Sequence, residues 1–294
     1  MQKLLRALAL GALFVAPAVT FAQDAPAVEE AAAPEPPAYN TGKLSLAGGV
    51  DLTTAYFFRG YNQEDQGVIV QPYMNLYFKL SESEKNPITG YIGTWNSLHS
   101  EKTLGDDGSF ETWYESDLYG GVDFGLGGGF TLGGIYTMYT YPGGAFDTIE
   151  EVGVKLSFDD TDKIGLPFAL KPYVGVYFET TDKNGTEDTY LEFGIAPTVY
   201  TINKDSDHAI ALSVPVTVGA SLDDYYFDDD GDDTFLGYVS VGLAGSMPIA
   251  SGPYGAWSLN GSVTWMQLIA DGLQAANHDD DYEIIGKIGV SFTY

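Results

Sequence analysis

The sequence predicts an all-β protein, a transmembrane antiparallel up-and-down β-barrel of about 12 strands. Three observations lead to this prediction. The 294-residue chain is rich in residues typical of strands and turns, with 36 Gly, 21 Tyr and 16 Phe. Apolar and polar residues alternate along most of it with a period of two, which places successive side chains on opposite faces of a strand. The chain also begins with the features of an export signal.

Composition excludes several other classes of protein. The chain contains no Cys, which excludes disulfide scaffolds, thiolate zinc sites and cysteine nucleophiles. It carries 13 Lys+Arg against 41 Asp+Glu, a formal net charge of -28. Because a phosphate-binding surface needs clustered basic residues, we expect no nucleic acid among its partners.

The first 42 residues precede the barrel. Residues 1–22 predict a signal peptide, because Lys3 and Arg6 are followed by a short apolar run and by small residues suited to cleavage after Ala22. Residues 23–42 form an Ala/Pro/Glu-rich stretch with little to bury, which predicts a disordered tether. A plain linker and a periplasmic attachment arm are both consistent with it. Residues 43–294 are assigned to the barrel.

Alternation defines the predicted strands. In residues 70–80, for example, Val70 and Phe78 share one face while Gln71 and Lys79 share the other. Most of these runs are 10 to 14 residues long, the length that a tilted strand needs to cross a bilayer. The twelve predicted strands cover residues 43–58, 68–81, 88–98, 110–124, 130–141, 147–158, 168–180, 187–202, 208–220, 234–248, 256–268 and 281–294.

The connections between these strands fall into two alternating sets. One set includes all the longest and most acidic connections, and the other consists of shorter ones with turn residues such as Asn86-Pro87. An even strand count with long loops on one rim and short turns on the other is the layout of an outer-membrane barrel. Closure is required there because hydrocarbon offers no hydrogen bonds to an open sheet edge.

The polar face favours a membrane barrel over a secreted β-sandwich. It mixes Tyr, Gly, Ser and Ala with scattered charges, which fits a crowded lumen, and aromatic residues recur near strand ends on the apolar face. The final residues, GKIGVSFTY, resemble the C-terminal insertion signal of bacterial outer-membrane proteins. We therefore expect the protein in the bacterial outer membrane, with its lipid as a partner. Four prolines lie inside predicted strands, where they predict bulges: Pro72, Pro172, Pro197 and Pro215.

Four segments of the first half resemble a known family. They are AYFFRGYNQEDQG, WYESDLYGG, MYTYPGG and IEEVGVKLSF, within residues 43–158. Their order and spacing are similar to the motifs of the TorF-type family of bacterial outer-membrane porins, whose function is largely uncharacterised. The resemblance implies a porin-like barrel, with no substrate and no catalytic residue carried over.

Inward-facing charges are the strongest indication of function. On the predicted register the lumen holds eight acidic side chains, including Asp123, against five basic ones, which favours cations or neutral solutes over anions. Twelve strands give a backbone diameter of about 24 Å, so side chains leave only a narrow path. A plugged barrel with internally paired charges stays open as an alternative. The predicted pore-lining residues are Asp51, Arg59, Tyr73, Lys79, Glu115, Asp117, Glu151, Lys155, Lys171, Glu179, Glu192, Glu283 and Lys287.

Two features suggest more specific roles. Arg59 is expected at the outer end of the first strand, either at a pore constriction or in a rim ion pair with Glu64 or Asp65. The loop LDDYYFDDDGDDT offers Asp228, Asp230 and Asp232 as candidate ligands for divalent cations, which prefer oxygen donors. It does not fit an EF-hand, and a solvated acidic loop is the alternative.

The sequence predicts no enzyme and implies no cofactor. His99 lies near Ser97 and Ser100, but no orienting acid can be assigned from the sequence. The predicted function is a porin-like channel for passive diffusion of small neutral or cationic solutes. The alternative is a closed structural or adhesive outer-membrane barrel whose acidic extracellular loops bind cations.

Overall fold

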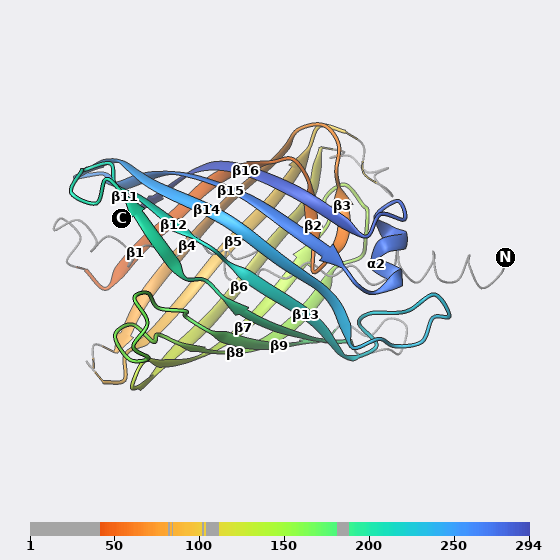
Figure 1. Cartoon of the computed structure of the whole chain (residues 1–294), viewed down its shortest axis with the longest axis horizontal. Coiled ribbons are helices and arrows are strands. Elements are labelled where there is room, and N and C mark those ends of the chain that lie inside the picture. The colour runs from red at the N-terminus through yellow and green to blue at the C-terminus, as the bar shows by residue number, and fades with distance from the viewer. Residues whose placement is uncertain (1–41, 82, 84, 102, 104–111, 181–187) are drawn as a thin grey trace.

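The wall of the molecule is one closed antiparallel sheet, described by a computed structural model that covers residues 42–81, 83, 85–101, 103, 112–180 and 188–294 (Figure 1). The predicted signal peptide, residues 1–22, lies outside the described residues, as does the predicted tether, residues 23–42, except for Gly42. No helix within the described part of the chain is long and apolar enough to cross a membrane.

Each wall strand pairs with its neighbours in the chain, and β14 pairs with β15 as well as with β12 and β13, which closes the barrel. The first and last strands, β1 and β16, also pair. The wall strands are β1 (Leu44–Thr53), β4 (Ile69–Ser81), β5 (Ile88–His99), β6 (Trp113–Gly127), β7 (Phe130–Thr140), β8 (Ile149–Phe158), β9 (Tyr173–Glu179), β10 (Thr189–Ile195), β11 (Thr198–Ile202), β12 (Ile210–Ser213), β13 (Val216–Asp223), β14 (Leu236–Gly252), β15 (Gly255–Leu268) and β16 (Tyr282–Thr293).

Two wall strands are interrupted, so the described residues form twelve strands of the wall, as predicted. β10 and β11 are one strand broken before Thr198, and β12 and β13 are one strand broken before Val216. The breaks fall at Pro197 and Pro215, which have no N–H to donate to a ladder. Pro172 lies just before β9, which is therefore shorter than the predicted strand.

Pro72 behaves differently from the other three prolines. It stays inside β4, in unbroken register with Val50 of β1. None of the four prolines therefore lies in the predicted bulge. The strand breaks at Pro197 and at Pro215, and β9 begins just after Pro172. At Pro72 the ladder to β1 continues without interruption.

The outer surface of the wall is apolar. Leu243, Ile284 and Ile288 are each more than half exposed. Alternate residues of the same strands point inward and are mostly polar, small or tyrosine, as in the burial pattern of β8. An exposed apolar band around a closed barrel is the surface that faces lipid, so the barrel is transmembrane.

Inward tyrosines pair with glycines on neighbouring strands. A Cβ atom on Gly93 would lie 2.5 Å from the ring of Tyr119, its direct partner, and one on Gly153 would lie 2.5 Å from the ring of Tyr177. The rings therefore fill the space above the glycines and lie against the wall, an arrangement known to stabilise glycine in sheets. The direct cross-strand pairs of this kind are Tyr73–Gly49, Tyr91–Gly121, Tyr119–Gly93, Tyr173–Gly194, Tyr177–Gly153 and Tyr238–Gly219.

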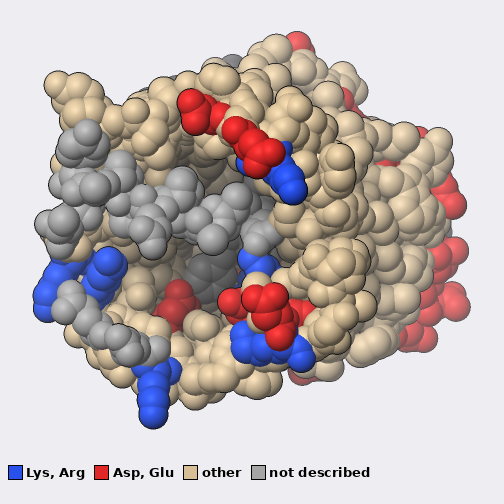
Figure 2. Space-filling model, turned by 60° about the vertical axis from the view of Figure 1, so that its left-hand side comes forward, with Lys and Arg blue, Asp and Glu red and all other residues tan. Residues whose placement is uncertain are grey.

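The two ends of the barrel differ, and we call them the turn end and the loop end. The turn end carries most of the short connections, the long β8–β9 connection and the chain's C-terminus, and is on the left of Figure 1. Figure 2 looks toward it and shows a hollow within the wall, with acidic and basic side chains on the rim. The loop end carries the long connections and a short helix, α2 (Asp271–Ala276), which contacts β3.

A separate hairpin, β2 (Tyr56–Phe58) with β3 (Tyr61–Glu64), folds into the barrel at the loop end. Its two-residue turn, Arg59-Gly60, has φ values of 46° and 88°, which suit the type I′ turns typical of hairpins. The prediction of one strand over residues 43–58, followed by an outer loop, was therefore wrong at its end. Tyr56, Phe57 and Phe58 are all buried, and only a position inside the barrel covers both faces of such a segment.

Candidate functional site: the loop-end interior

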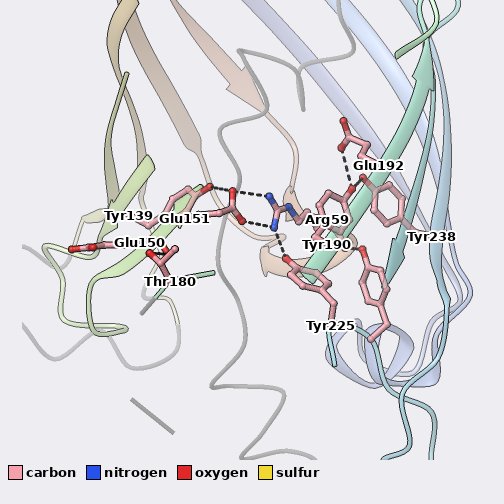
Figure 3. Close-up of polar contacts among 10 residues, drawn as sticks. Arg59, Tyr139, Glu150, Glu151, Thr180, Tyr190, Glu192, Tyr225 and Tyr238 are labelled. Carbon is pink, nitrogen blue, oxygen red and sulfur yellow. Dashed lines mark hydrogen bonds and ion pairs between the residues drawn. The ribbon is translucent and has the colours of Figure 1, made fainter. Parts of the chain in front are cut away.

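Arg59, at the tip of the β2–β3 hairpin, is the centre of the interior at the loop end (Figure 3). Its guanidinium donates two hydrogen bonds to the Glu151 carboxylate of β8, from Nη1 at 2.8 Å and from Nη2 at 3.0 Å. Both side chains are buried, at 0% and 3% exposure. A two-point Arg–carboxylate pair is geometrically specific as well as strong. The expectation that Arg59 forms a rim ion pair was therefore wrong.

Aromatic rings enclose the same guanidinium. Its Cζ atom lies 4.0 Å from the ring centroid of Tyr190, 4.9 Å from those of Tyr177 and Phe58, and 5.3 Å from that of Tyr225. Cations are attracted to ring faces at such distances, most strongly where water is excluded. We call the wall residues around Arg59, namely Glu151, Tyr177 and Tyr190, the cage.

Hydrogen bonds between tyrosines and carboxylates fix the cage in place. Tyr139 of β7 donates to Glu151 at 3.1 Å, and Tyr190 donates to Glu192 at 3.0 Å. Tyr226 donates to the backbone carbonyl of Arg59 at 2.8 Å, so the hairpin tip is held as well. Burial by itself lowers the pKa of Arg59, but the Glu151 carboxylate more than reverses this, so the pKa lies well above its usual value. The guanidinium is therefore charged at any physiological pH.

A second group of contacts holds the other arm of the hairpin. Thr103 donates to Glu64 of β3 at 2.9 Å and contacts Nδ1 of His99 at 2.7 Å, while Nε2 of His99 contacts the Ser97 hydroxyl at 2.8 Å. Ser97 and His99 lie two residues apart on one strand and so share the inward face. The sequence could not assign an acid to this pair, and the structure places Glu64 there.

Ser97 is fully buried, at 0% exposure, and His99 stacks on Tyr114 at 4.6 Å. The Ser97 hydroxyl is engaged with His99, and the chain of contacts ends on Glu64 of the hairpin, so we interpret this group as an anchor for the hairpin. That the protein is not an enzyme stays a prediction.

Two buried carboxylates line the wall beside the hairpin. Tyr56 donates to Oε2 of Glu115 at 3.0 Å, but Oε1 of Glu115 and both carboxylate oxygens of Asp117 have no hydrogen-bond partner within the described part of the chain. Asp117 is only 1% exposed. Nearby, Tyr114 donates to Gln63 of β3 at 2.6 Å, a further contact between hairpin and wall. This side of the interior therefore holds two carboxyl groups with no basic side chain bonded to them among the described residues.

The middle and turn end of the interior are more open and differently charged. Asp51 has Lys287 as its electrostatic neighbour, and Asp123 has Lys155. A ladder of small polar side chains crosses three strands, in which the Ser246 hydroxyl donates to Asn260 at 2.8 Å and the Asn260 amide donates to Ser291 at 2.9 Å. These side chains are half-buried rather than buried, so solvent reaches this part of the interior.

The predicted pore-lining residues separate along the barrel axis. Those in the hairpin or in the loop-end part of the wall are Arg59, Glu115, Asp117, Glu151, Glu179, Glu192 and Glu283. Those toward the middle or turn end are Asp51, Tyr73, Lys79, Lys155, Lys171 and Lys287. Lys171 lies in the connection before β9 and has a left-handed φ of 51°, so it is outside the strand in which it was predicted.

The acidic loop shows no metal site. Asp228 accepts hydrogen bonds at 3.0 Å from the backbone N–H groups of Asp230 and Asp232, which makes it part of a turn. Within the described residues, no group of three or more His, Asp or Glu side chains is arranged to hold a metal ion. Binding of divalent cations by this loop stays a prediction.

Sequence reasoning missed four functional residues of the interior. Tyr139, Tyr190 and Tyr225 were not singled out, and no contact with Arg59 was predicted for Tyr177. One signal was available, because Arg59-Gly60 follows an aromatic run and precedes Tyr61, which is the pattern of a tight hairpin with one apolar arm. The partner of Arg59 could not be found in this way, since Glu151 lies 92 residues away.

Comparisons with solved structures return outer-membrane barrels. An outer-membrane channel from Pseudomonas putida F1 is similar with 8% identity and a TM-score of 0.47 over 85% of this chain and 94% of that one. The β domain of the Bordetella autotransporter BrkA is similar with 11% identity and a TM-score of 0.45 over 86% and 98%. A porin refined at 1.8 Å is similar with 12% identity and a TM-score of 0.32 over 86% and 99%.

The family assignment rests on a different comparison. No curated protein matches the chain. A family model described as "Bacterial protein of unknown function (Gcw_chp)" matches residues 37–240, more than half of the sequence. The TorF name does not occur in that description, so the resemblance to that family stays a prediction. The match itself shows that this transmembrane β-barrel belongs to the Gcw_chp family of bacterial proteins.

Proposed function

We propose that the protein is a porin-like channel of the bacterial outer membrane, for passive diffusion of small neutral or cationic solutes. One observation carries the proposal: the inner face toward the turn end is lined by polar, half-buried side chains, and a hollow lies within the wall at that end (Figure 2). A barrel that only anchored loops would have no need of a polar interior, because a closed core is more stable when apolar residues fill it.

Charge at the hairpin supports the preference for cations. The inward set at the loop end has six acids and one base, whereas the set toward the turn end has four bases and two acids, Asp51 and Asp123. An anion that enters from the turn end therefore meets mostly acidic side chains where the hairpin fills the barrel. Selectivity is proposed to arise there and not along the whole wall.

The rival function is a closed structural or adhesive barrel, and the hairpin favours it. Arg59 and Phe58 are fully buried, and the hairpin contacts several wall strands through hydrogen bonds. On this reading the interior charges only hold the plug in place. The acidic loops would then bind cations or partners outside the cell.

Single-channel recording in planar bilayers decides between the two. The full chain is compared with a variant in which residues 55–67 are replaced by a short Gly/Ser link. We expect small, cation-selective steps from the full chain and steps several-fold larger from the variant. Silence from both, in preparations whose barrels migrate as folded on unheated gels, would support the closed barrel. Liposome swelling with sugars, amino acids and nucleosides then identifies the solutes that pass.

A further inference from the structure

The cage around Arg59 is built entirely from the wall, whereas its occupant comes from the hairpin. Glu151 belongs to β8, Tyr177 to β9 and Tyr190 to β10, three consecutive wall strands. We propose that the cage is a binding site for small guanidinium or ammonium cations, which Arg59 fills here as a tethered ligand. This deepens the proposed function, on which it rests, by naming the class of solute that the channel binds.

The geometry of the cage matches a free cation of this type. The Glu151 carboxylate receives two parallel hydrogen bonds, at 2.8 and 3.0 Å, the form that a planar guanidinium provides. The Tyr190 ring lies 4.0 Å from Cζ of Arg59, and the Tyr177 ring lies 4.9 Å away. A carboxylate combined with aromatic faces is a general solution for the recognition of organic cations. None of these contacts depends on the hairpin backbone.

Charge around the cage also favours a cation over a neutral solute. Asp117 and Glu179 are electrostatic neighbours of Glu151, so three carboxylates act on the same volume. Among the described residues, Arg59 is the one basic side chain within ion-pair distance of Glu151. Without Arg59 the buried Glu151 carboxylate would lose its ion-pair partner, so it must either take up a proton or pair with another cation.

The occupant can leave without breaking the wall. β2 and β3 form their own two-stranded sheet and are not paired with any wall strand of the described chain. The hairpin is held by side-chain contacts, such as those of Tyr56 and Gln63 with β6. A tethered side chain competes with free ligand at an effective concentration in the mM range, so free cations need similar concentrations to displace it.

Chemical rescue tests the proposal. Arg59→Ala empties the cage, and the purified variant is titrated with methylguanidinium while its thermal unfolding midpoint is followed. We expect saturable stabilisation at mM concentrations, with no effect from methylurea, which has a similar shape and no charge. The affinity for methylguanidinium should be about tenfold or more lower in the double variant Arg59→Ala/Glu151→Gln than in Arg59→Ala, because the double variant lacks the charged hydrogen-bond acceptor.

A matched control separates the cage from a simple cation–π contact. Lys155 lies 4.0 Å from the Tyr173 ring centroid, so Lys155→Ala also exposes a ring that held a cation, but outside the cage. Methylguanidinium should not stabilise this variant. If Arg59→Ala does not fold, the variant with residues 55–67 replaced exposes the same cage and is titrated in its place.

Either of two results would overturn the proposal: no saturable effect of methylguanidinium on the emptied cage, or an equal effect on Lys155→Ala and on the double variant. The measurement does not depend on conduction. A barrel that conducts ions but is not stabilised by methylguanidinium would therefore contradict the proposed cation site and leave the proposed channel function standing. A barrel that does not conduct but is stabilised would contradict the channel function alone.

Discussion

The loop-end and turn-end parts of the interior are built from the same wall strands but differ in packing and charge. Toward the loop end, Glu115, Asp117 and Glu192 are at most 1% exposed, and the hairpin tip is buried among them. Toward the turn end, inward side chains such as Lys155 and Asn260 keep part of their surface in contact with solvent. The strand pattern is the same in both parts, so the inserted hairpin creates the difference.

Tyrosine has a different role in each part. In the middle and turn-end parts, the rings of Tyr91 and Tyr119 cover glycines of the neighbouring strand and so lie against the wall. At the loop end, Tyr139 and Tyr190 donate hydrogen bonds to buried carboxylates and hold them for the hairpin. One residue type therefore lines the wall in one part and holds the carboxylates that contact the hairpin in the other.

Removal of the Glu151 charge, which holds Arg59, should have the largest effect on the difference between the loop-end and turn-end parts of the interior. Glu151→Gln leaves a buried guanidinium without its ion-pair partner, which costs about 3–5 kcal/mol for buried pairs. We expect a corresponding loss in the free energy of unfolding, measured by urea titration in detergent micelles, and more frequent opening in bilayers. Glu283→Gln, at a half-buried inward position on β16, is the control and should change stability by less than about 0.5 kcal/mol. Equal losses in both variants would contradict the special role of Glu151.

A side chain added at a glycine that a tyrosine ring covers should alter the packing in the middle of the barrel interior. In Gly93→Val, the new Cβ atom would lie 2.5 Å from the Tyr119 ring, which must move away from the wall. Overpacking of this kind costs about 1–3 kcal/mol and should reduce conductance of the hairpin-deleted barrel. Gly134→Val is the matched control, because nothing lies within 4 Å of its Cβ position. An unchanged conductance in Gly93→Val would show that the ring does not turn into the bore.

Loss of one hairpin hydrogen bond should have a smaller effect. Tyr114→Phe removes the 2.6 Å bond to Gln63 and leaves the buried amide oxygen without this donor. A cost of about 1 kcal/mol is expected in the same urea titration. Tyr254→Phe serves for comparison, because Tyr254 is 87% exposed in a turn and should have no measurable effect.

A pH dependence is expected at the loop-end rim. Burial raises the pKa of Asp188 to about 8, helped by the charges of Glu179 and three aspartates, from an unfolded value of 3.8. Between about pH 4 and pH 8 the folded chain therefore holds a proton on Asp188 that the unfolded chain releases. The stability that this proton contributes is complete below about pH 4 and is lost as pH rises through 8.

Asp188→Asn keeps the neutral form at every pH. Its unfolding midpoint should therefore exceed that of the unmodified chain at pH 9 and match it at pH 4. A constant offset between the two proteins at both pH values would show that Asp188 does not titrate in this range.

Much of the barrel could be predicted from residues close together in the sequence. Alternation over residues 70–80 and 281–294 identified β4 and β16, because a period of two is a property of one strand. Proline positions showed where ladders are interrupted, but not that Pro72 would be accommodated. The inward direction of Glu115, Glu151 and Glu192 also followed from the strand pattern.

The candidate site could be predicted only in part. Arg59 was identified as a residue of interest, but its expected partners Glu64 and Asp65 are close in sequence and do not bind it. A hairpin with apolar residues on both faces has to be buried, yet the sequence does not state which cavity will receive it. Ser97 and His99 were likewise noticed without the Thr103–Glu64 link that explains them.

The sequence by itself determined that the chain forms a closed antiparallel wall with an apolar outside and a polar inside, because strand geometry and the lack of hydrogen bonds in lipid leave few other solutions. Only the tertiary structure decided that residues 56–64 enter the barrel and that Arg59 meets Glu151. That contact joins segments 92 residues apart, and its geometry follows from barrel closure and strand register, which no local pattern encodes.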